Sequence, residues 1–220
     1  MVKAILFDLD RTLLDRDQSV QRFINSQYDR LENILSYIDK KEYVSKFLEL
    51  DQYGYMPKDE VYQQMVALFG MKGLTWKELL DDYNREFMYS CIGFPNLIFM
   101  LDKLKKRSFL LGIITNGHVQ FQMDNIKSLG IENYFDTILI SRWEGIKKPD
   151  PNIFLRAVNH LCVEPSECMF IGDHLVNDIQ AAKKVGMKAV WKRAGTQDHM
   201  DVDYIIDDLR EIVSIGDEIG

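Results

Sequence analysis

From residue 96 to residue 215, short apolar runs alternate with segments of helical periodicity, and this alternation constrains the fold more than any other feature. Including one run at the N-terminus, the apolar runs predict buried strands at residues 2–7, 109–115, 137–140, 168–171, 187–191 and 204–206. Helical periodicity marks residues 97–107, 119–129, 152–161, 179–185 and a last segment from 209 onward. Such alternation predicts an α/β fold with a doubly wound, Rossmann-like parallel sheet.

A helical block, residues 16–90, separates the first strand from the others. Its apolar residues recur at spacings of three and four and predict helices at 17–39 and 41–50, then one that opens at Pro57. A further helix follows Thr75, with Glu78 three residues later as a capping box. We predict that residues 16–90 form an inserted helical cap, and that residues 1–15 and 91–220 form the core.

Composition excludes several classes of partner. The chain has 220 residues, a net charge of −7 and no basic block, so we expect no nucleic-acid partner. Its three cysteines form no Cys-x-x-Cys pair, which favours free thiols in a reducing compartment. No apolar run reaches membrane-spanning length, and no signal peptide is visible. We expect a cytoplasmic protein without a membrane partner; monomer and homodimer both stay open.

Two aspartates, Asp8 and Asp10, come directly after the first predicted strand. If the strand pitch continued, both side chains would point to the same side. Carboxylates brought together without a partner repel each other and lose hydration. They either lie apart in solvent or share a cation, and oxygen ligands of this kind suit Mg²⁺. Two more acids, Asp173 and Asp178, follow the strand at 168–171.

Two other loops offer groups that bind anions. Thr115 and Asn116 end a predicted strand, where a hydroxyl, an amide and backbone N–H groups open the next helix. Lys148 precedes Pro149, which biases it away from helical geometry. Taken singly, each group is typical of an ordinary turn or surface position. Together they lie where parallel sheets bind ligands, at the carboxyl ends of strands.

Four motifs in this order resemble the haloacid dehalogenase superfamily of phosphohydrolases. They are Asp-x-Asp-x-Thr at 8–12, Thr-Asn at 115–116, Lys-Pro at 148–149 and Gly-Asp-x-x-x-x-Asp at 172–178. The resemblance covers nearly the full chain, and the helical block is similar to the family's smaller helical cap. Residues 115–130 and 134–136 most resemble the nucleotidase and acylneuraminate-phosphatase branch.

The resemblance implies roles for the four acids. Asp8 would be the nucleophile that forms an aspartyl-phosphate, and Asp10 would be the general acid and then the general base. The side chains of Asp8 and Asp173 and the main-chain carbonyl of Asp10 would hold Mg²⁺. Asp178 would act behind these ligands or through water.

The resemblance also implies how the phosphoryl group is bound. Thr115, the Asn116 backbone and Lys148 would bind its oxygens, and Lys148 would stabilise charge in the transition state. Lys147 is an alternative, but the residue directly before the proline matches the motif better. Members that remove halide lack the acid found here as Asp10, so its presence favours phosphate chemistry.

The implied function is a Mg²⁺-dependent phosphatase acting on a small phosphorylated metabolite, such as a nucleoside monophosphate or a sugar phosphate. Two alternatives stay open. A sugar phosphomutase would return the phosphoryl group to its substrate, and a non-catalytic module would only bind phosphate or metal. Residues 16–90 are expected to select the substrate, and no motif there identifies it.

Overall fold

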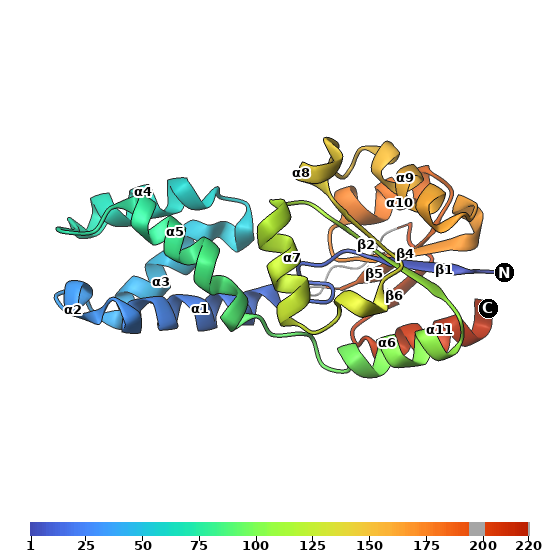
Figure 1. The fold of residues 1–220 in the computed structure, drawn as a ribbon, viewed down its shortest axis with the longest axis horizontal. Coiled ribbons are helices and arrows are strands. Elements are labelled where there is room, and N and C mark those ends of the chain that lie inside the picture. Colours follow the sequence, from blue (N-terminus) through green and yellow to red (C-terminus); the bar gives the residue numbers. More distant parts are fainter. Residues whose placement is uncertain (194–200, 220) are drawn as a thin grey trace. The chain divides into compact units, whose positions relative to one another are not determined.

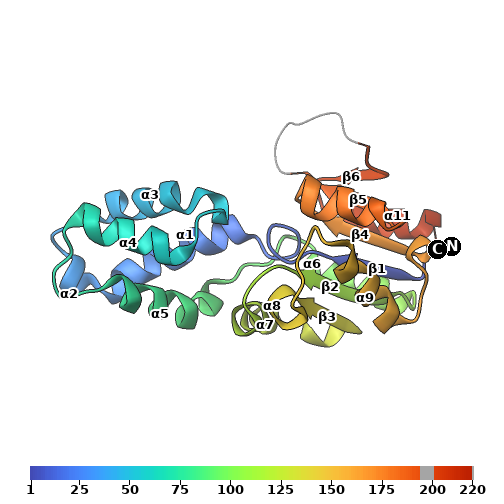
Figure 2. The ribbon, with the colours of Figure 1, turned by 90° about the horizontal axis from the view of Figure 1, so that it is seen from above.

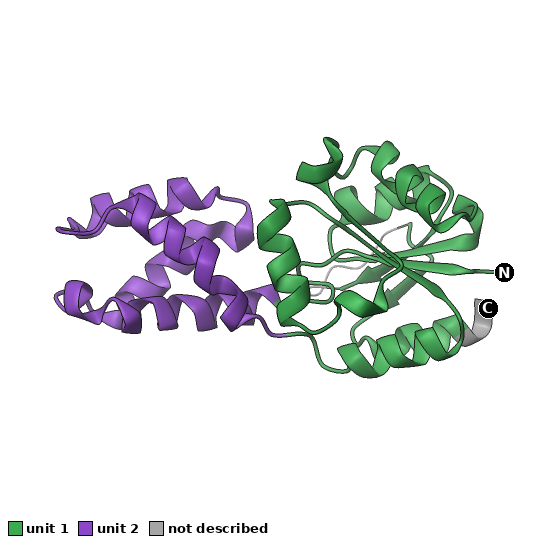
Figure 3. Ribbon diagram, in the orientation of Figure 1, with its two compact units in different colours: residues 1–15, 93–220 green, residues 16–92 purple. Residues whose placement is uncertain are grey.

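The computed structural model describes residues 1–193 and 201–219, and the chain divides into two compact units (Figure 3). Met1–Asp15 and Gly93–Gly220 form unit 1, and Arg16–Ile92 form unit 2. The chain therefore leaves unit 1 after the first strand and returns to it before the second. Within the described residues, no helix is both long and apolar enough to cross a bilayer.

Unit 1 is built on a parallel sheet that contains six strands among the described residues. They are β1 (Ala4–Phe7), β2 (Leu110–Thr115), β3 (Thr137–Ile140), β4 (Cys168–Gly172), β5 (Lys188–Lys192) and β6 (Tyr204–Ile206). The order is β3-β2-β1-β4-β5-β6, and each neighbouring pair is parallel. The prediction of an α/β fold with a doubly wound parallel sheet is confirmed.

The strand register determines where the functional side chains emerge. β1 lies between β2 and β4, and Phe7 at its end pairs with Ile113 and with Ile171. Every residue of β1 is fully buried, as expected for a strand covered on both faces. The loops after β1, β2 and β4 therefore open side by side at one edge of the sheet.

Helices cover both faces of this sheet. They are α6 (Leu97–Lys106), α7 (Val119–Ser128), α8 (Ser141–Glu144), α9 (Pro151–Leu161), α10 (Ala181–Lys184) and α11 (Arg210–Ile219), with short turns of other helix types at Glu132–Tyr134, Pro165–Glu167 and Leu175–Gln180. In Figures 1 and 2, α6 and α11 lie together on one face, and α9 and α10 lie on the other. Phe154 of α9 packs edge-on against Phe170 of β4, with ring centres 5.0 Å apart.

The secondary structure of unit 2 is entirely helical. It contains α1 (Arg16–Arg30), α2 (Glu32–Leu35), α3 (Lys40–Asp51), α4 (Lys58–Phe69) and α5 (Trp76–Glu86), with 3-10 turns at Gln52–Gly54 and Phe87–Ser90. Its interior holds aromatic side chains such as Phe23, Tyr62 and Tyr83. The buried amide of Gln27 accepts hydrogen bonds from Tyr43 and Tyr62 through its oxygen.

Unit 2 also contains a partly buried ion cluster. Arg16 donates hydrogen bonds of 3.0 and 3.2 Å to the two carboxylate oxygens of Asp51, and Lys58 pairs with the same carboxylate. Burial alone would raise the pKa of the Asp51 carboxyl, but the two cations outweigh burial and lower it. Asp51 therefore stays ionised at neutral pH although it is only 2% exposed.

Two local predictions need correction, one short helix was missed, and one prediction is confirmed. The helix predicted at 17–39 breaks after Arg30, where the Tyr28 hydroxyl donates to the Ile38 carbonyl at 2.6 Å and fixes the turn. Of the helix predicted at 179–185, residues 179–180 belong to a π-helical segment, Leu175–Gln180, and α10 covers only Ala181–Lys184. The short helix α8 was not predicted. The capping box of Thr75 and Glu78 is present.

Candidate active site

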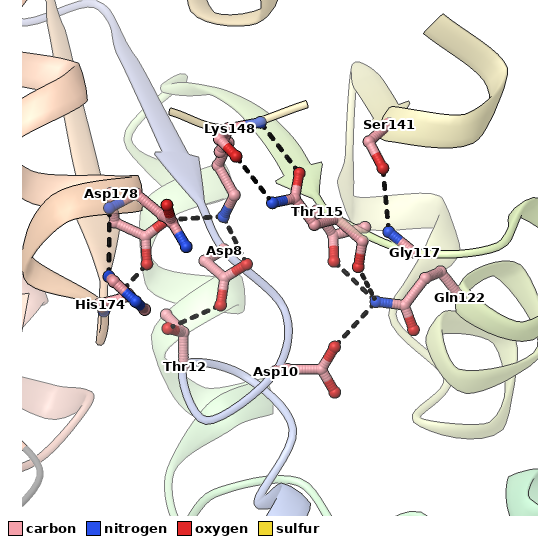
Figure 4. Close-up of polar contacts among 12 residues, drawn as sticks. Asp8, Asp10, Thr12, Thr115, Gly117, Gln122, Ser141, Lys148, His174 and Asp178 are labelled. Atoms are coloured by element: carbon pink, nitrogen blue, oxygen red, sulfur yellow. Dashed lines mark hydrogen bonds and ion pairs between the residues drawn. The ribbon is translucent and has the colours of Figure 1, made fainter. Parts of the chain in front are cut away.

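The loop after β1 separates the two aspartates that follow the strand. The N–H groups of Thr12, Leu13 and Leu14 all donate to the Leu9 carbonyl, so the chain turns tightly. Because the chain turns here and does not continue as a strand, the Asp8 and Asp10 carboxylates point in different directions (Figure 4). Asp8 is buried, and the hydroxyl of Thr12 donates to it at 3.3 Å.

Lys148 is the centre of the charged contacts. Its Nζ donates to Asp8 Oδ1 and to Asp178 Oδ1, each at 2.6 Å (Figure 4). Asn116 positions the lysine, because its side-chain amide donates to the Lys148 carbonyl at 3.0 Å and its side-chain oxygen accepts from the Lys148 N–H at 2.9 Å. Lys148 is buried whereas Lys147 is exposed, so only Lys148 lies among the acids.

The loop after β4 brings in two further carboxylates. A Cβ at Gly172 would lie 2.5 Å from the Asp178 carboxyl, so only glycine permits this approach. Asp178 Oδ2 accepts the His174 N–H at 3.0 Å. The His174 ring accepts the N–H groups of Val176 and Asn177 at Nδ1, and this caps the π-helical segment that carries Asp178.

Asp8, Asp173 and Asp178 form a carboxylate cluster. One oxygen from each lies within 4.8 Å of the others. With Lys148 ionised, three carboxylates and one ammonium leave an excess negative charge, which a divalent cation would offset. The oxygen donors therefore fit Mg²⁺. Asp178, which the sequence placed behind the metal ligands, belongs to this cluster.

Burial and mutual repulsion raise the pKa values of Asp8 and Asp173. The pKa of Asp173 is raised to about 6 by burial first and then by the charge of Asp178. Burial also raises the pKa of Asp8, and Asp178 and Asp173 add to this although Lys148 opposes it. For Lys148, burial alone would lower the pKa, but Asp178 and Asp8 outweigh burial and raise it. Lys148 is therefore positively charged at neutral pH.

A second polar cluster lies beside the first and contains a residue that sequence reasoning did not assign a role. Thr115, at the end of β2, is buried and accepts a hydrogen bond of 2.7 Å from Gln122 Nε2. The same nitrogen donates to Asp10 Oδ2 at 2.8 Å (Figure 4). Ser141 of α8 accepts the Gly117 N–H at 3.0 Å. Neither Gln122 nor Ser141 belongs to one of the four motifs. Gln122 lies in the 115–130 stretch that resembles the nucleotidase and acylneuraminate-phosphatase branch, but the resemblance gave it no role.

The structure brings all seven predicted residues to the carboxyl edge of the sheet. Asp8 and Asp10 follow β1, Thr115 and Asn116 lie at the end of β2, Asp173 and Asp178 follow β4, and Lys148 precedes α9. Hydrogen bonds join six of them into two clusters, one around Lys148 and one around Gln122 (Figure 4). Asp173 lies beside the first cluster, with a carboxylate oxygen within 4.8 Å of Asp8 and Asp178.

Comparison with known proteins identifies the family. The model of the family described as haloacid dehalogenase-like hydrolase matches residues 5–192. The chain belongs to this family. The predictions of family membership and of a hydrolase are confirmed.

Several relatives of this hydrolase align over most of its length. Glyceraldehyde 3-phosphate phosphatase from Pyrococcus furiosus is 31% identical and covers 97% of this chain and 92% of its own. N-acylneuraminate-9-phosphatase from Mus musculus is 27% identical and covers 86% and 82%. The crystal structure of a HAD phosphatase from Thermococcus onnurineus is 32% identical, covers 97% of both chains and has a TM-score of 0.69. The acylneuraminate-phosphatase branch is thus among the relatives, as predicted.

Proposed function

We propose that this protein is a Mg²⁺-dependent phosphatase that hydrolyses a small phosphomonoester through an aspartyl-phosphate on Asp8. The observation that carries the proposal is the position of Lys148, whose Nζ lies 2.6 Å from both Asp8 and Asp178. An anionic nucleophile needs positive charge nearby before an anionic phosphoryl group can approach it. The buried ammonium beside Asp8 meets that need.

The proposed reaction has two steps. In the first, a carboxylate oxygen of Asp8 attacks phosphorus, the bond from phosphorus to the leaving oxygen breaks, and the Asp10 carboxyl gives its proton to that oxygen. In the second, water attacks the phosphorus of the aspartyl-phosphate while the Asp10 carboxylate takes a proton from the water. The Asp8–phosphorus bond breaks, and inorganic phosphate leaves.

Other groups of the chain act on the phosphoryl oxygens. In this proposal the hydroxyl of Thr115, the backbone of Asn116 and the ammonium of Lys148 bind these oxygens and stabilise their charge in the transition state. Asn116 also holds the Lys148 backbone through two hydrogen bonds of 2.9 and 3.0 Å. Its side chain therefore serves to position the lysine.

The proposed magnesium site uses the oxygens of Asp8 and Asp173 with the Asp10 carbonyl, and Asp178 lies next to these ligands. The close approach of the Asp8, Asp173 and Asp178 carboxylates, within 4.8 Å, supports a cation there. When bound, Mg²⁺ would neutralise charge on the nucleophile and on the phosphoryl group.

The relatives guide the choice of substrate. Their names specify phosphatases of glyceraldehyde 3-phosphate and of N-acylneuraminate 9-phosphate, both small phosphorylated metabolites. We propose a substrate of this size, a sugar phosphate or a nucleoside monophosphate. We also propose that residues 16–90 act as the cap that selects it and that residues 1–15 and 91–220 carry the chemistry.

A panel of phosphomonoesters tests the proposal. The panel contains glyceraldehyde 3-phosphate, N-acylneuraminate 9-phosphate, sugar phosphates, nucleoside monophosphates and p-nitrophenyl phosphate, each assayed for inorganic phosphate with Mg²⁺ and with a chelator. We expect turnover that requires Mg²⁺ and that disappears in Asp8→Asn. No turnover of any compound, or full activity of Asp8→Asn, would overturn the proposal.

A further inference from the structure

Gln122 lies between two groups to which the proposed reaction assigns different tasks. Its Nε2 is 2.8 Å from Asp10 Oδ2, 2.7 Å from Thr115 Oγ1 and 3.2 Å from the Asn116 carbonyl. The side chain is only 2% exposed, so water does not compete freely for these contacts. A single amide group therefore bridges the loops after β1 and β2 (Figure 4).

Two neighbours fix the orientation of this amide. Asn125, one turn further along α7, donates from Nδ2 to Gln122 Oε1 at 3.2 Å, which leaves the Nε2 end facing Asp10. Gly117 has a φ of 155°, and a Cβ there would lie 2.8 Å from Gln122 Cγ. The backbone at Gly117 thus makes room for the glutamine, and any other residue would displace it.

We propose that Gln122 is a positioning residue for the proton transfers of Asp10. This inference rests on the proposed phosphatase function. By engaging Asp10 Oδ2, the amide holds the carboxyl group in one orientation, so Oδ1 is the oxygen that exchanges the proton. The amide also donates to Thr115 Oγ1, which therefore acts as an acceptor in this contact. The hydroxyl hydrogen of Thr115 is then available to a phosphoryl oxygen.

Substrates with different leaving groups distinguish this positioning role from a merely structural one. An alkoxide leaving group needs a proton from Asp10, whereas p-nitrophenolate departs without one. We therefore measure kcat/KM of Gln122→Met for the best alkyl phosphomonoester of the panel and for p-nitrophenyl phosphate. We expect a loss of about 100-fold for the alkyl ester, which needs the proton from Asp10. For the aryl ester we expect only about threefold, because only the contact of Gln122 with Thr115 affects its reaction.

The matched control is Gln120→Met. Gln120 is a glutamine of the same helix, and its amide also donates to an aspartate, Asp124, at 2.8 Å, but this pair lies on the surface. We expect this variant to keep wild-type kcat/KM for both esters. Circular dichroism and urea unfolding establish that each variant is folded.

Each outcome decides the inference. Equal losses for the two esters, or no loss for either, would overturn it. If Gln122→Met does not fold, the same ratio is measured for Gln122→Asn, whose amide is one methylene too short to reach Asp10. In an Asp10→Asn background, Gln122→Met should add little to the loss for the alkyl ester, and a full additional loss would contradict the role. Absence of turnover in the wild-type protein would instead refute the phosphatase function itself.

Discussion

Replacing Lys148 by methionine removes the ammonium that lies 2.6 Å from both Asp8 and Asp178. Lys148 is only 3% exposed, so solvent cannot replace its charge. Removing one partner of a buried ion pair costs about 3–5 kcal/mol, because the remaining charge stays buried without compensation. Losses within one network are not additive, so the second carboxylate does not double this cost. We expect the free energy of unfolding of Lys148→Met to fall by about 3–5 kcal/mol at neutral pH.

The pH dependence of this loss follows from the direction of the pKa shifts. The pKa of Lys148 is raised above its unfolded value, so its contribution to stability is complete at neutral pH and is lost only as the pH rises through the raised pKa. Burial already raises the pKa of the Asp8 carboxyl. Without the ammonium this pKa rises further, so Asp8 takes up a proton more readily as the pH falls. The difference in stability between wild type and variant should therefore shrink as the pH falls through the raised pKa of Asp8 in the variant.

Urea unfolding in the presence of a chelator measures this loss, and the panel assay with Mg²⁺ measures activity. The matched control is Lys147→Met, which removes an exposed neighbouring lysine and should change stability by less than about 0.5 kcal/mol. We expect kcat of Lys148→Met to fall by about 10² to 10³, since a charge that stabilises the transition state is lost. A Lys148→Met protein as stable and active as Lys147→Met would refute the reasoning.

Three further predictions concern backbone space, the ion cluster of unit 2 and a helix cap. Gly172→Ala should lower the free energy of unfolding by about 1–3 kcal/mol and abolish turnover, because the alanine Cβ would lie 2.5 Å from the Asp178 carboxyl. Urea unfolding measures the stability and phosphate release measures the turnover. Normal turnover of this variant would contradict the prediction. Asp51→Asn should cost about 3 kcal/mol at neutral pH, because it removes the buried carboxylate that the partly buried cations Arg16 and Lys58 both contact. The folded pKa of Asp51 is lowered, so this loss should vanish as the pH falls below that pKa; a loss that does not change with pH in urea titrations would argue against the ion cluster. Thr75→Ala should cost about 1 kcal/mol in the same titrations without changing kcat, and a stability equal to wild type would show that the cap contributes nothing.

The sequence predicted the sheet and the charged centre of the site for a shared physical reason. A buried parallel strand is a continuous apolar run, and the carboxyl ends of such strands meet at one edge. Polar residues at or just after the ends of those runs, such as Asp8, Thr115 and Asp173, are therefore expected to lie together. Lys148 could be assigned because it stands in a motif beside a proline.

The remaining features depend on tertiary contacts that no local pattern reveals. The divergence of Asp8 and Asp10 arises from three N–H groups that converge on the Leu9 carbonyl. Asp178 reaches the acid cluster through the π-helical segment and through the space left by Gly172. Gln122 is one of several glutamines in the sequence, and only the folded chain places it against Asp10.

The central claim is that Asp8 takes the phosphoryl group from the substrate, and acid quenching tests it most directly. The enzyme is mixed with a radiolabelled phosphomonoester and Mg²⁺ and quenched in acid during turnover. It is then digested with pepsin at low pH, where an acyl phosphate survives, and the peptide that contains Asp8 is isolated. We predict label on Asp8 within this peptide, no label in Asp8→Asn and prolonged label in Asp10→Asn, because the base that activates water is lost. A wild-type enzyme that turns over without labelling this peptide, or an Asp8→Asn variant that is labelled like wild type, would contradict the account.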